Sequence, residues 1–221
     1  MCIRDRGYVF AKHIFGIKGS YAVDPQKGAV VMTLTTQGDV PIHYTLDGSE
    51  PTAASPRYTG PVEIGKSARF RATALREGGE NASYSREFAF SKSTGRPAVL
   101  NTKPNDSYTF EGASLLVDGY HSRPVFTSGA WLGYLDEPLD VTIDMGGEQS
   151  YRSVELETLA EKGDWIFPPS SVTVWVSDNG TDFTEVASVA VPEAKAGDAD
   201  GIGRYRMQSV SYTHLRAHET E

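Results

Sequence analysis

The segment 42–52, IHYTLDGSEPT, constrains the fold more than any other part of the sequence. Its first half alternates apolar and polar residues, which is the pattern of a half-buried strand. Asp47 and Gly48 then form a turn dipeptide, and Pro51 cannot donate to the ladder of a central strand. The segment therefore predicts a strand that ends in a tight turn at the edge of a β-sheet.

Short runs of the same kind recur along the whole chain, and no long helical period competes with them. In one of them Phe70, Ala72 and Ala74 are expected to face inward, with Arg69, Arg71 and Thr73 outward. The fold class predicted is all-β, with two consecutive β-sandwiches at 20–91 and 98–208 and a linker at 92–97. The predicted strands are 29–36, 42–46, 62–64, 68–75, 85–91, 114–117, 139–143, 153–158, 172–177, 185–191 and 204–207.

Composition narrows the classes of partner. The net charge is −8, which argues against a nucleic-acid partner because phosphate binding needs a basic stripe. No apolar run approaches the roughly 20 residues that span a bilayer, so we expect no membrane span. The single cysteine, Cys2, allows neither a disulfide framework nor a cysteine-based metal site.

Both ends of the chain resemble translated sequencing adapter. Residues 1–6 (MCIRDR) and 209–221 (ending SYTHLRAHETE) carry no periodicity that would bury one face. We expect both to be non-native and to form no strand. Residues 7–19 are then expected to be a linker from a missing catalytic barrel, together with a first strand.

The segment 42–52 resembles a signature of the small C-terminal β-domain that follows the catalytic barrel in bacterial family 20 β-N-acetylhexosaminidases and chitobiases. The resemblance implies a small immunoglobulin- or fibronectin-like sandwich at 20–91. It also implies a parent that hydrolyses terminal N-acetylhexosamine residues, with the parent catalytic barrel as a partner in cis. The parent would be exported, so a periplasmic or extracellular location is expected.

Five landmarks of the second half occur in the order found in the discoidin, or coagulation factor 5/8 type C, fold, which includes family 32 carbohydrate-binding modules. This resemblance covers about residues 97–207 and implies a jelly roll, which we expect to be truncated before its closing strand. It also makes Trp131 a core residue. The landmarks are 116–119 (LVDG), Trp131, 141–147 (VTIDMGG), 165–169 (WIFPP) and 174–183 (VWVSDNGTDF).

Catalysis is not expected of this chain. The resembled enzymes use an adjacent Asp-Glu pair, and Asp136-Glu137 is such a pair. Pro138 and the alternating strand that follows make it a solvated turn instead, and a barrel of about 250 residues is absent.

Sugar binding is the remaining activity, since carbohydrate sites combine aromatic rings with fixed polar side chains. The predicted contacts are Tyr120, His121, Arg123, Tyr134 and Trp165, although Trp165 could instead pack under the turn that follows it. Relatives of the discoidin type carry a structural calcium near this turn, so Asp118 is the candidate metal ligand; no other cofactor is expected.

Three hypotheses remain open. The favoured one is a non-catalytic accessory region of a β-N-acetylhexosaminidase, whose second half could bind glycans or N-acetylhexosamine-containing oligosaccharides. A second is a pair of bracing domains that bind no ligand. The third is a pair of carbohydrate-binding modules from another glycosidase, such as an α-L-fucosidase.

Overall fold

The computed structural model describes residues 16–38, 40–76, 81–194 and 198–208, and the backbone course of 211–220. The predicted linker at 7–15 and the adapter-like residues 1–6 lie outside these ranges. The chain divides into two compact units, Met1–Phe90 and Ser91–Glu221. Within the described residues, no helix is both long enough and apolar enough to cross a membrane.

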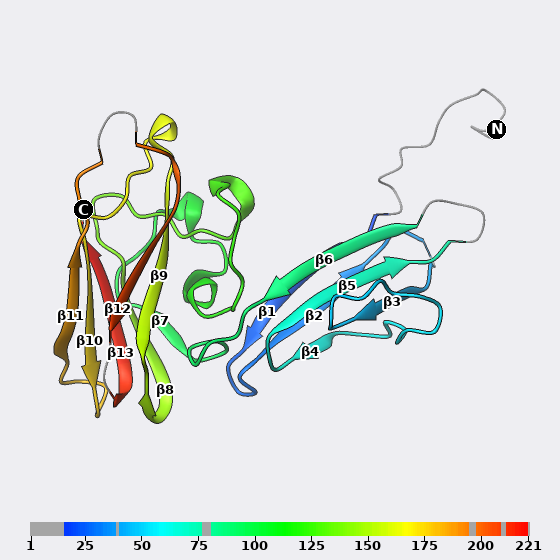
Figure 1. Ribbon diagram of the computed structural model, residues 1–221, viewed down its shortest axis with the longest axis horizontal. Helices are drawn as coiled ribbons and strands as arrows, with labels where there is room; N and C mark the ends of the chain where they lie inside the picture. The colour runs from blue at the N-terminus through cyan, green and yellow to red at the C-terminus, as the bar shows by residue number, and fades with distance from the viewer. Residues whose placement is uncertain (1–15, 39, 77–80, 195–197, 209–210, 221) are drawn as a thin grey trace. The chain divides into compact units, whose positions relative to one another are not determined.

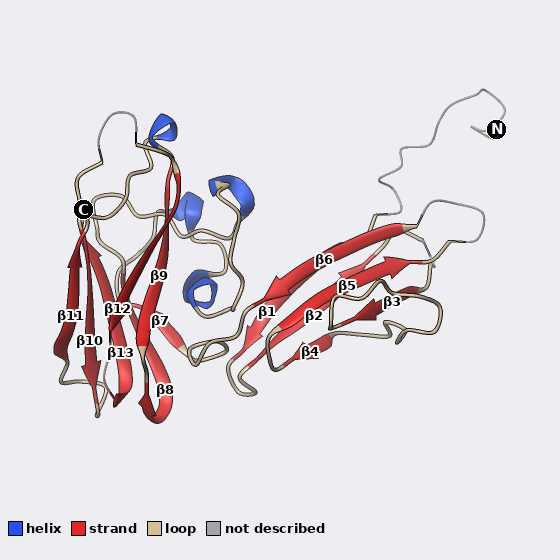
Figure 2. Cartoon of the chain, viewed as in Figure 1, coloured by secondary structure: helices blue, strands red, loops and turns tan. Residues whose placement is uncertain are grey.

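The first unit is a sandwich of two three-stranded antiparallel sheets (Figures 1 and 2). One sheet has the order β1-β2-β4 and the other β3-β5-β6. The strands are β1 (Lys18–Asp24), β2 (Ala29–Thr35), β3 (Ile42–Thr45), β4 (Val62–Ile64), β5 (Ala68–Ala74) and β6 (Ala82–Phe88).

The core of this unit lies between the inward faces of the two sheets. Met32 of β2 and Phe70 of β5 are each 0% exposed, and Phe88 of β6 is 1% exposed. The Tyr21 and Phe88 rings meet edge to face across 5.3 Å, which joins β1 to β6. The all-β class and the sandwich are therefore confirmed for this unit.

One residue of the first unit that was predicted to face outward is buried. Phe70, Ala72 and Ala74 are buried as expected, but Thr73, expected to face outward, is only 4% exposed. Its hydroxyl lies 3.3 Å from Glu50 Oε1, on the loop after β3. A loop distant in sequence therefore covers this face, and strand alternation alone does not reveal that.

The second unit pairs a five-stranded sheet, β11-β10-β13-β8-β7, with a two-stranded sheet, β12-β9. Its core cluster is Met145, Val172, Val174, Val176 and Met207. Short 3-10 helices lie outside the strands (Figure 2). The elements are β7 (Ala98–Leu100), η3 (Asp106–Tyr108), η4 (Gly112–Leu116), η5 (Phe126–Ser128), β8 (Asp140–Ser150), β9 (Ser153–Ala160), η6 (Lys162–Asp164), β10 (Ser171–Ser177), β11 (Thr184–Ala190), β12 (Gly201–Gln208) and β13 (Ser211–Thr220).

Two sequence expectations about the second unit are wrong. The strand expected at 114–117 is instead the end of η4 and its C-cap Val117, because the Ser114 hydroxyl and the Val117 N–H both bond locally to backbone carbonyls, at 2.8 and 3.1 Å. The tail expected to form no strand contains β13, which pairs antiparallel with β8 and β10. Backbone groups on those two strands accept a neighbour without requiring an apolar pattern in it. The non-native origin of the tail stays a prediction.

Candidate functional site

The loop that carries most of the predicted contacts is fixed at both ends. Asp118 is 4% exposed, and its Oδ1 accepts the Tyr120 N–H at 2.8 Å. Five residues after Asp118, the Arg123 carbonyl accepts the Trp131 indole N–H at 3.0 Å. His121 therefore lies on a short loop whose backbone is held on either side.

His121 belongs to a charged cluster with two strand residues. Its Nδ1 lies 3.0 Å from Glu157 Oε1, and Arg204 Nε donates to the same oxygen at 2.7 Å. Glu157 on β9 and Arg204 on β12 are direct partners in the β9–β12 ladder, so the register of the sheet creates this pair. We call His121, Glu157 and Arg204 the carboxylate cluster.

The Glu157 side chain is much less exposed than the two side chains that bind it. The Glu157 side chain is 16% exposed, whereas those of His121 and Arg204 are 55% and 58% exposed. Burial alone would raise the pKa of Glu157, but the hydrogen bonds and positive charge of Arg204 and His121 outweigh it and hold that pKa below its usual range. The carboxylate therefore stays ionised near neutral pH and is fixed in position by its two partners.

The cluster also keeps hydrogen-bonding capacity. Both bonds end on Oε1, and no hydrogen bond to Glu157 Oε2 occurs within the described part of the chain. Arg204 uses its Nε–H here, and a guanidinium carries four further N–H donors. Glu157 Oε2 can therefore accept a hydrogen bond while the remaining Arg204 N–H groups donate. Two adjacent hydroxyl groups of a sugar can bind such a combination.

The other predicted contacts differ in how far they are exposed. Tyr120 and Arg123 flank His121 in sequence, with Tyr120 half-buried and Arg123 exposed. Tyr134 has a buried hydroxyl oxygen, so that atom is not presented to a ligand. Trp131, expected in the core, is only half-buried.

Trp165 lies on a separate knuckle after β9. Its side chain is 83% exposed, so the alternative that it packs under the following turn is wrong. Its φ of +61° is left-handed, and its ring meets the exposed Phe167 ring at 6.4 Å. Lys162 anchors the knuckle, because its ammonium lies 2.7 Å from Asp200 Oδ1. Trp165 and Phe167 thus form a small exposed aromatic pair, which we call the aromatic knuckle.

The described residues can also be searched for a metal-binding cluster. Among the residues described, no group of three His, Cys, Asp or Glu side chains could hold a metal ion. A calcium ion at Asp118 stays a prediction. Asp136 and Glu137 lie in an exposed bend, where Asp136 has a φ of +63°.

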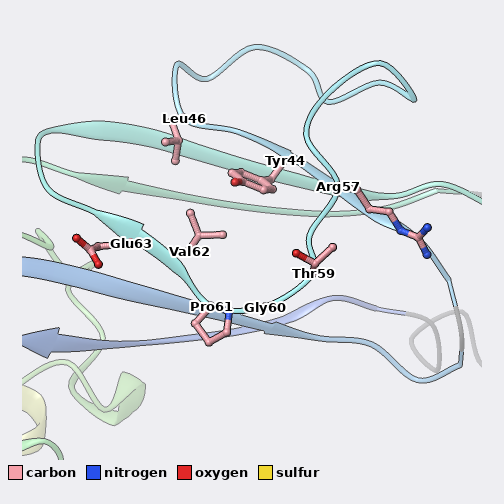
Figure 3. Close-up of a pocket in the computed structure, with 8 residues that line it drawn as sticks. All are labelled: Tyr44, Leu46, Arg57, Thr59, Gly60, Pro61, Val62 and Glu63. Atoms are coloured by element: carbon pink, nitrogen blue, oxygen red, sulfur yellow. The ribbon is translucent and has the colours of Figure 1, made fainter.

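A hollow of about 350 Å³ opens on the first unit between β3 and β4 (Figure 3). Tyr44 and Leu46 line it from one side, and Pro61 and Val62 line it from the other. The Tyr44 ring stacks on Phe70, with centroids 5.7 Å apart and planes 15° apart. Sequence reasoning missed this hollow because it gave the segment 42–52 only a structural role.

The comparison that bears on the first unit is with a protein-family model. Residues 19–86 match the chitobiase/beta-hexosaminidase C-terminal domain. The matched region is the first sandwich, and it includes β3, the Asp47-Gly48 turn and the hollow. The resemblance drawn from the segment 42–52 is thereby confirmed for this region, and the second unit lies outside the match. A comparison with curated protein sequences finds no match.

Two solved structures show similarity at low identity. One is the C-terminal domain of a chitobiase from Bacteroides fragilis, with 16% identity, a TM-score of 0.35, and coverage of 56% of this chain and 81% of that one. The other is an f-lectin (fucolectin) from striped bass, Morone saxatilis, serum, with 10% identity, a TM-score of 0.38, and coverage of 93% and 80%. At these TM-scores neither structure places a residue of this chain in a site.

Proposed function

We propose that this chain is a non-catalytic accessory region of a glycosidase, and that its second unit binds carbohydrate at the carboxylate cluster. The observation that carries the proposal is the Glu157 carboxylate, mostly buried and held by His121 and Arg204. Sugar hydroxyls bind best to polar groups that are already ionised and fixed, because little freedom is then lost on binding.

The restrained conformation of the loop around His121 also favours ligand binding at the carboxylate cluster. The loop around His121 is restrained by Asp118 and Trp131, so the imidazole needs no rearrangement to meet a ligand. The aromatic knuckle offers a ring surface of the type that packs on the apolar face of a pyranose. We assign it a secondary role, because its one ring contact within the described residues is the one between Trp165 and Phe167.

We also propose which enzyme this accessory region belongs to. The family matched by residues 19–86 is described as a C-terminal domain of chitobiases and β-hexosaminidases. We therefore propose a β-N-acetylhexosaminidase catalytic barrel in cis, exported to the periplasm or the extracellular space. A structural calcium ion at Asp118 is a further proposal, tested by the melting temperature with calcium and with a chelator.

A glycan array probed with the full chain, alongside the His121→Ala variant, tests the binding proposal. The expected result is binding of one glycan class by the parent chain, with at least about tenfold weaker signal for the variant. No bound glycan, or equal binding by the variant, would reject the site. Turnover of a chromogenic N-acetylglucosaminide by the chain alone would reject its non-catalytic role.

A further inference from the structure

The aromatic knuckle is an exposed ring surface that contributes little to the packing of the second unit. The Trp165 side chain is 83% exposed and that of Phe167 is 56% exposed. Their ring planes stand 77° apart with centroids at 6.4 Å, so the two rings form an open corner. Exposed aromatic rings that lie together are the kind of surface on which a ligand binds.

The turn that carries the aromatic knuckle follows β9, includes η6 and is held at several points (Figure 1). Glu161 and Ile166 exchange two backbone hydrogen bonds, at 2.9 and 3.1 Å, and the Trp165 N–H donates to the Lys162 carbonyl at 3.2 Å. Lys162 binds Asp200 Oδ1 through its ammonium at 2.7 Å and through its backbone N–H at 3.2 Å. The rings are therefore presented on a fixed backbone, which loses little freedom when a ligand binds.

The same turn carries two carboxyl groups without a basic partner. The Lys162 ammonium is bound to Asp200, and neither Glu161 nor Asp164 forms an ion pair within the described part of the chain. Burial raises the pKa of Glu161, and the Asp164 carboxyl and the charge of Asp200 raise that pKa further. A carboxyl group responds in this way where negative charge is in excess. We call Glu161 and Asp164 the acidic pair.

Aromatic rings that share a turn with the acidic pair favour a positively charged ligand. Asp164 directly precedes Trp165, and Glu161 is hydrogen-bonded to Ile166, which lies between the two aromatic residues in the sequence. A cation is attracted to the negative face of an aromatic ring, most strongly to that of tryptophan. The field of the acidic pair attracts the same cation, repels acidic sugars and gives no advantage to a neutral sugar.

We propose that the aromatic knuckle binds an amino sugar whose amino group is free, as in an oligomer of glucosamine. A pyranose of the oligomer packs on the Trp165 ring, and its ammonium groups are attracted to Glu161 and Asp164. The choice of a sugar rests on the proposed function, whereas the choice of a positive charge rests on the turn itself. The site uses none of the side chains of the carboxylate cluster.

Titration of the full chain with a glucosamine trimer, followed by NMR at the Ile166 and Phe167 amides, tests this assignment. At about pH 6 the amino groups of the trimer are largely protonated. The expected result is saturable shifts at both amides with a dissociation constant of about 1 mM. The N-acetylglucosamine trimer, which has the same rings without the charge, is expected to bind at least about fivefold more weakly.

Variants of the full chain show which side chains take part. Trp165→Asn should weaken binding of the glucosamine trimer at least about tenfold. Asp164→Asn should weaken it about threefold, and the matched control Asp136→Asn, an equal change of charge in another exposed bend, should leave it unchanged. His121→Ala should also leave it unchanged, because His121 belongs to the carboxylate cluster.

Several outcomes would overturn the proposal. They are the absence of shifts at the two amides, equal affinity for the N-acetylated trimer, and equal binding of trilysine, which has the charges without a pyranose and would indicate a basic-peptide site. An equal loss in Asp164→Asn and Asp136→Asn would attribute the binding to overall charge, and a loss in His121→Ala would move it to the carboxylate cluster. The proposed function fails if His121→Ala keeps glycan binding on the array, and this inference fails if Trp165→Asn keeps trimer binding, so the two fail separately.

Discussion

Arg204 and Glu157 face each other in the β9–β12 ladder, and Arg204 Nε donates to Glu157 Oε1 at 2.7 Å. Two residues 47 positions apart are brought together by strand register alone. The next pair along the ladder on the same faces, Arg206 and Glu155, is also basic against acidic. There the Arg206 Nε instead donates to Ser153 Oγ at 2.9 Å. The pair Arg206 and Glu155 can therefore serve as a control for the carboxylate cluster on the same two strands.

The ionised Glu157 carboxylate is expected to stabilise the second unit in a pH-dependent way. Because the folded pKa of Glu157 lies below its unfolded value of about 4.3, the contribution is complete above that pH and is lost as the pH falls through the folded pKa. Glu157→Gln should therefore cost about 1 kcal/mol of unfolding free energy at pH 7 and less than that at about pH 3. Denaturant unfolding at the two pH values measures this, with Glu155→Gln as the control; an equal loss at both would contradict the assignment.

The turn in the segment 42–52 depends on a glycine. Gly48 has a φ of +85°, and a Cβ there would lie 3.1 Å from the Arg69 Cβ. We expect Gly48→Ala to destabilise the first unit by about 1 to 2 kcal/mol. Gly60→Ala is the matched control, because a Cβ at Gly60 meets no atom within 4 Å. Thermal unfolding of the two variants measures the difference, and equal melting temperatures would show that the turn tolerates a side chain.

Replacing Trp165 should leave the stability of the second unit almost unchanged, whereas replacing Trp131 should lower it. Trp165 is 83% exposed, and its backbone has a left-handed conformation that asparagine also tolerates. Trp165→Asn should therefore change stability by less than about 0.5 kcal/mol. Trp131 is half-buried and its indole bonds the Arg123 carbonyl, so Trp131→Ala should cost about 2 kcal/mol. Urea unfolding measures both. A large loss in Trp165→Asn would mean that the ring packs against the protein.

The tail is the element on which sequence and structure differ most. A chain ending at Gln208 would lack β13 and leave β8 and β10 without a shared neighbour. We expect the chain shortened to Gln208 to lose hydrogen-exchange protection in β8 and β10, while β2 and β5 of the first unit keep theirs. Unchanged protection in β8 and β10 would show that the tail is dispensable, as its resemblance to adapter sequence implies.

Strands were predictable where β-branched and apolar residues are concentrated in a short run. The run 62–64 was placed with the bounds of β4, and 29–36 and 172–177 each lie within one residue of β2 and β10. β13 could not be predicted, because its place is determined by the backbone groups of β8 and β10 rather than by its own pattern.

The site was only half predictable for a related reason. Loop composition pointed to His121, since a histidine beside a tyrosine after an Asp-Gly turn suits ligand contact. Glu157 and Arg204 were visible only as polar residues of two predicted strands. No sequence signal states that these strands pair, or in which register, so the partners of His121 emerged only from the sheet.

Calorimetric titration of a bound glycan into the full chain and two arginine variants tests the central claim most directly. If the carboxylate cluster reads sugar hydroxyls, Arg204→Ala should weaken binding at least about tenfold, and Arg206→Ala, on the same strand and face, should change it less than about twofold. Equal affinity in all three chains, or an equal loss in both variants, would contradict the claim.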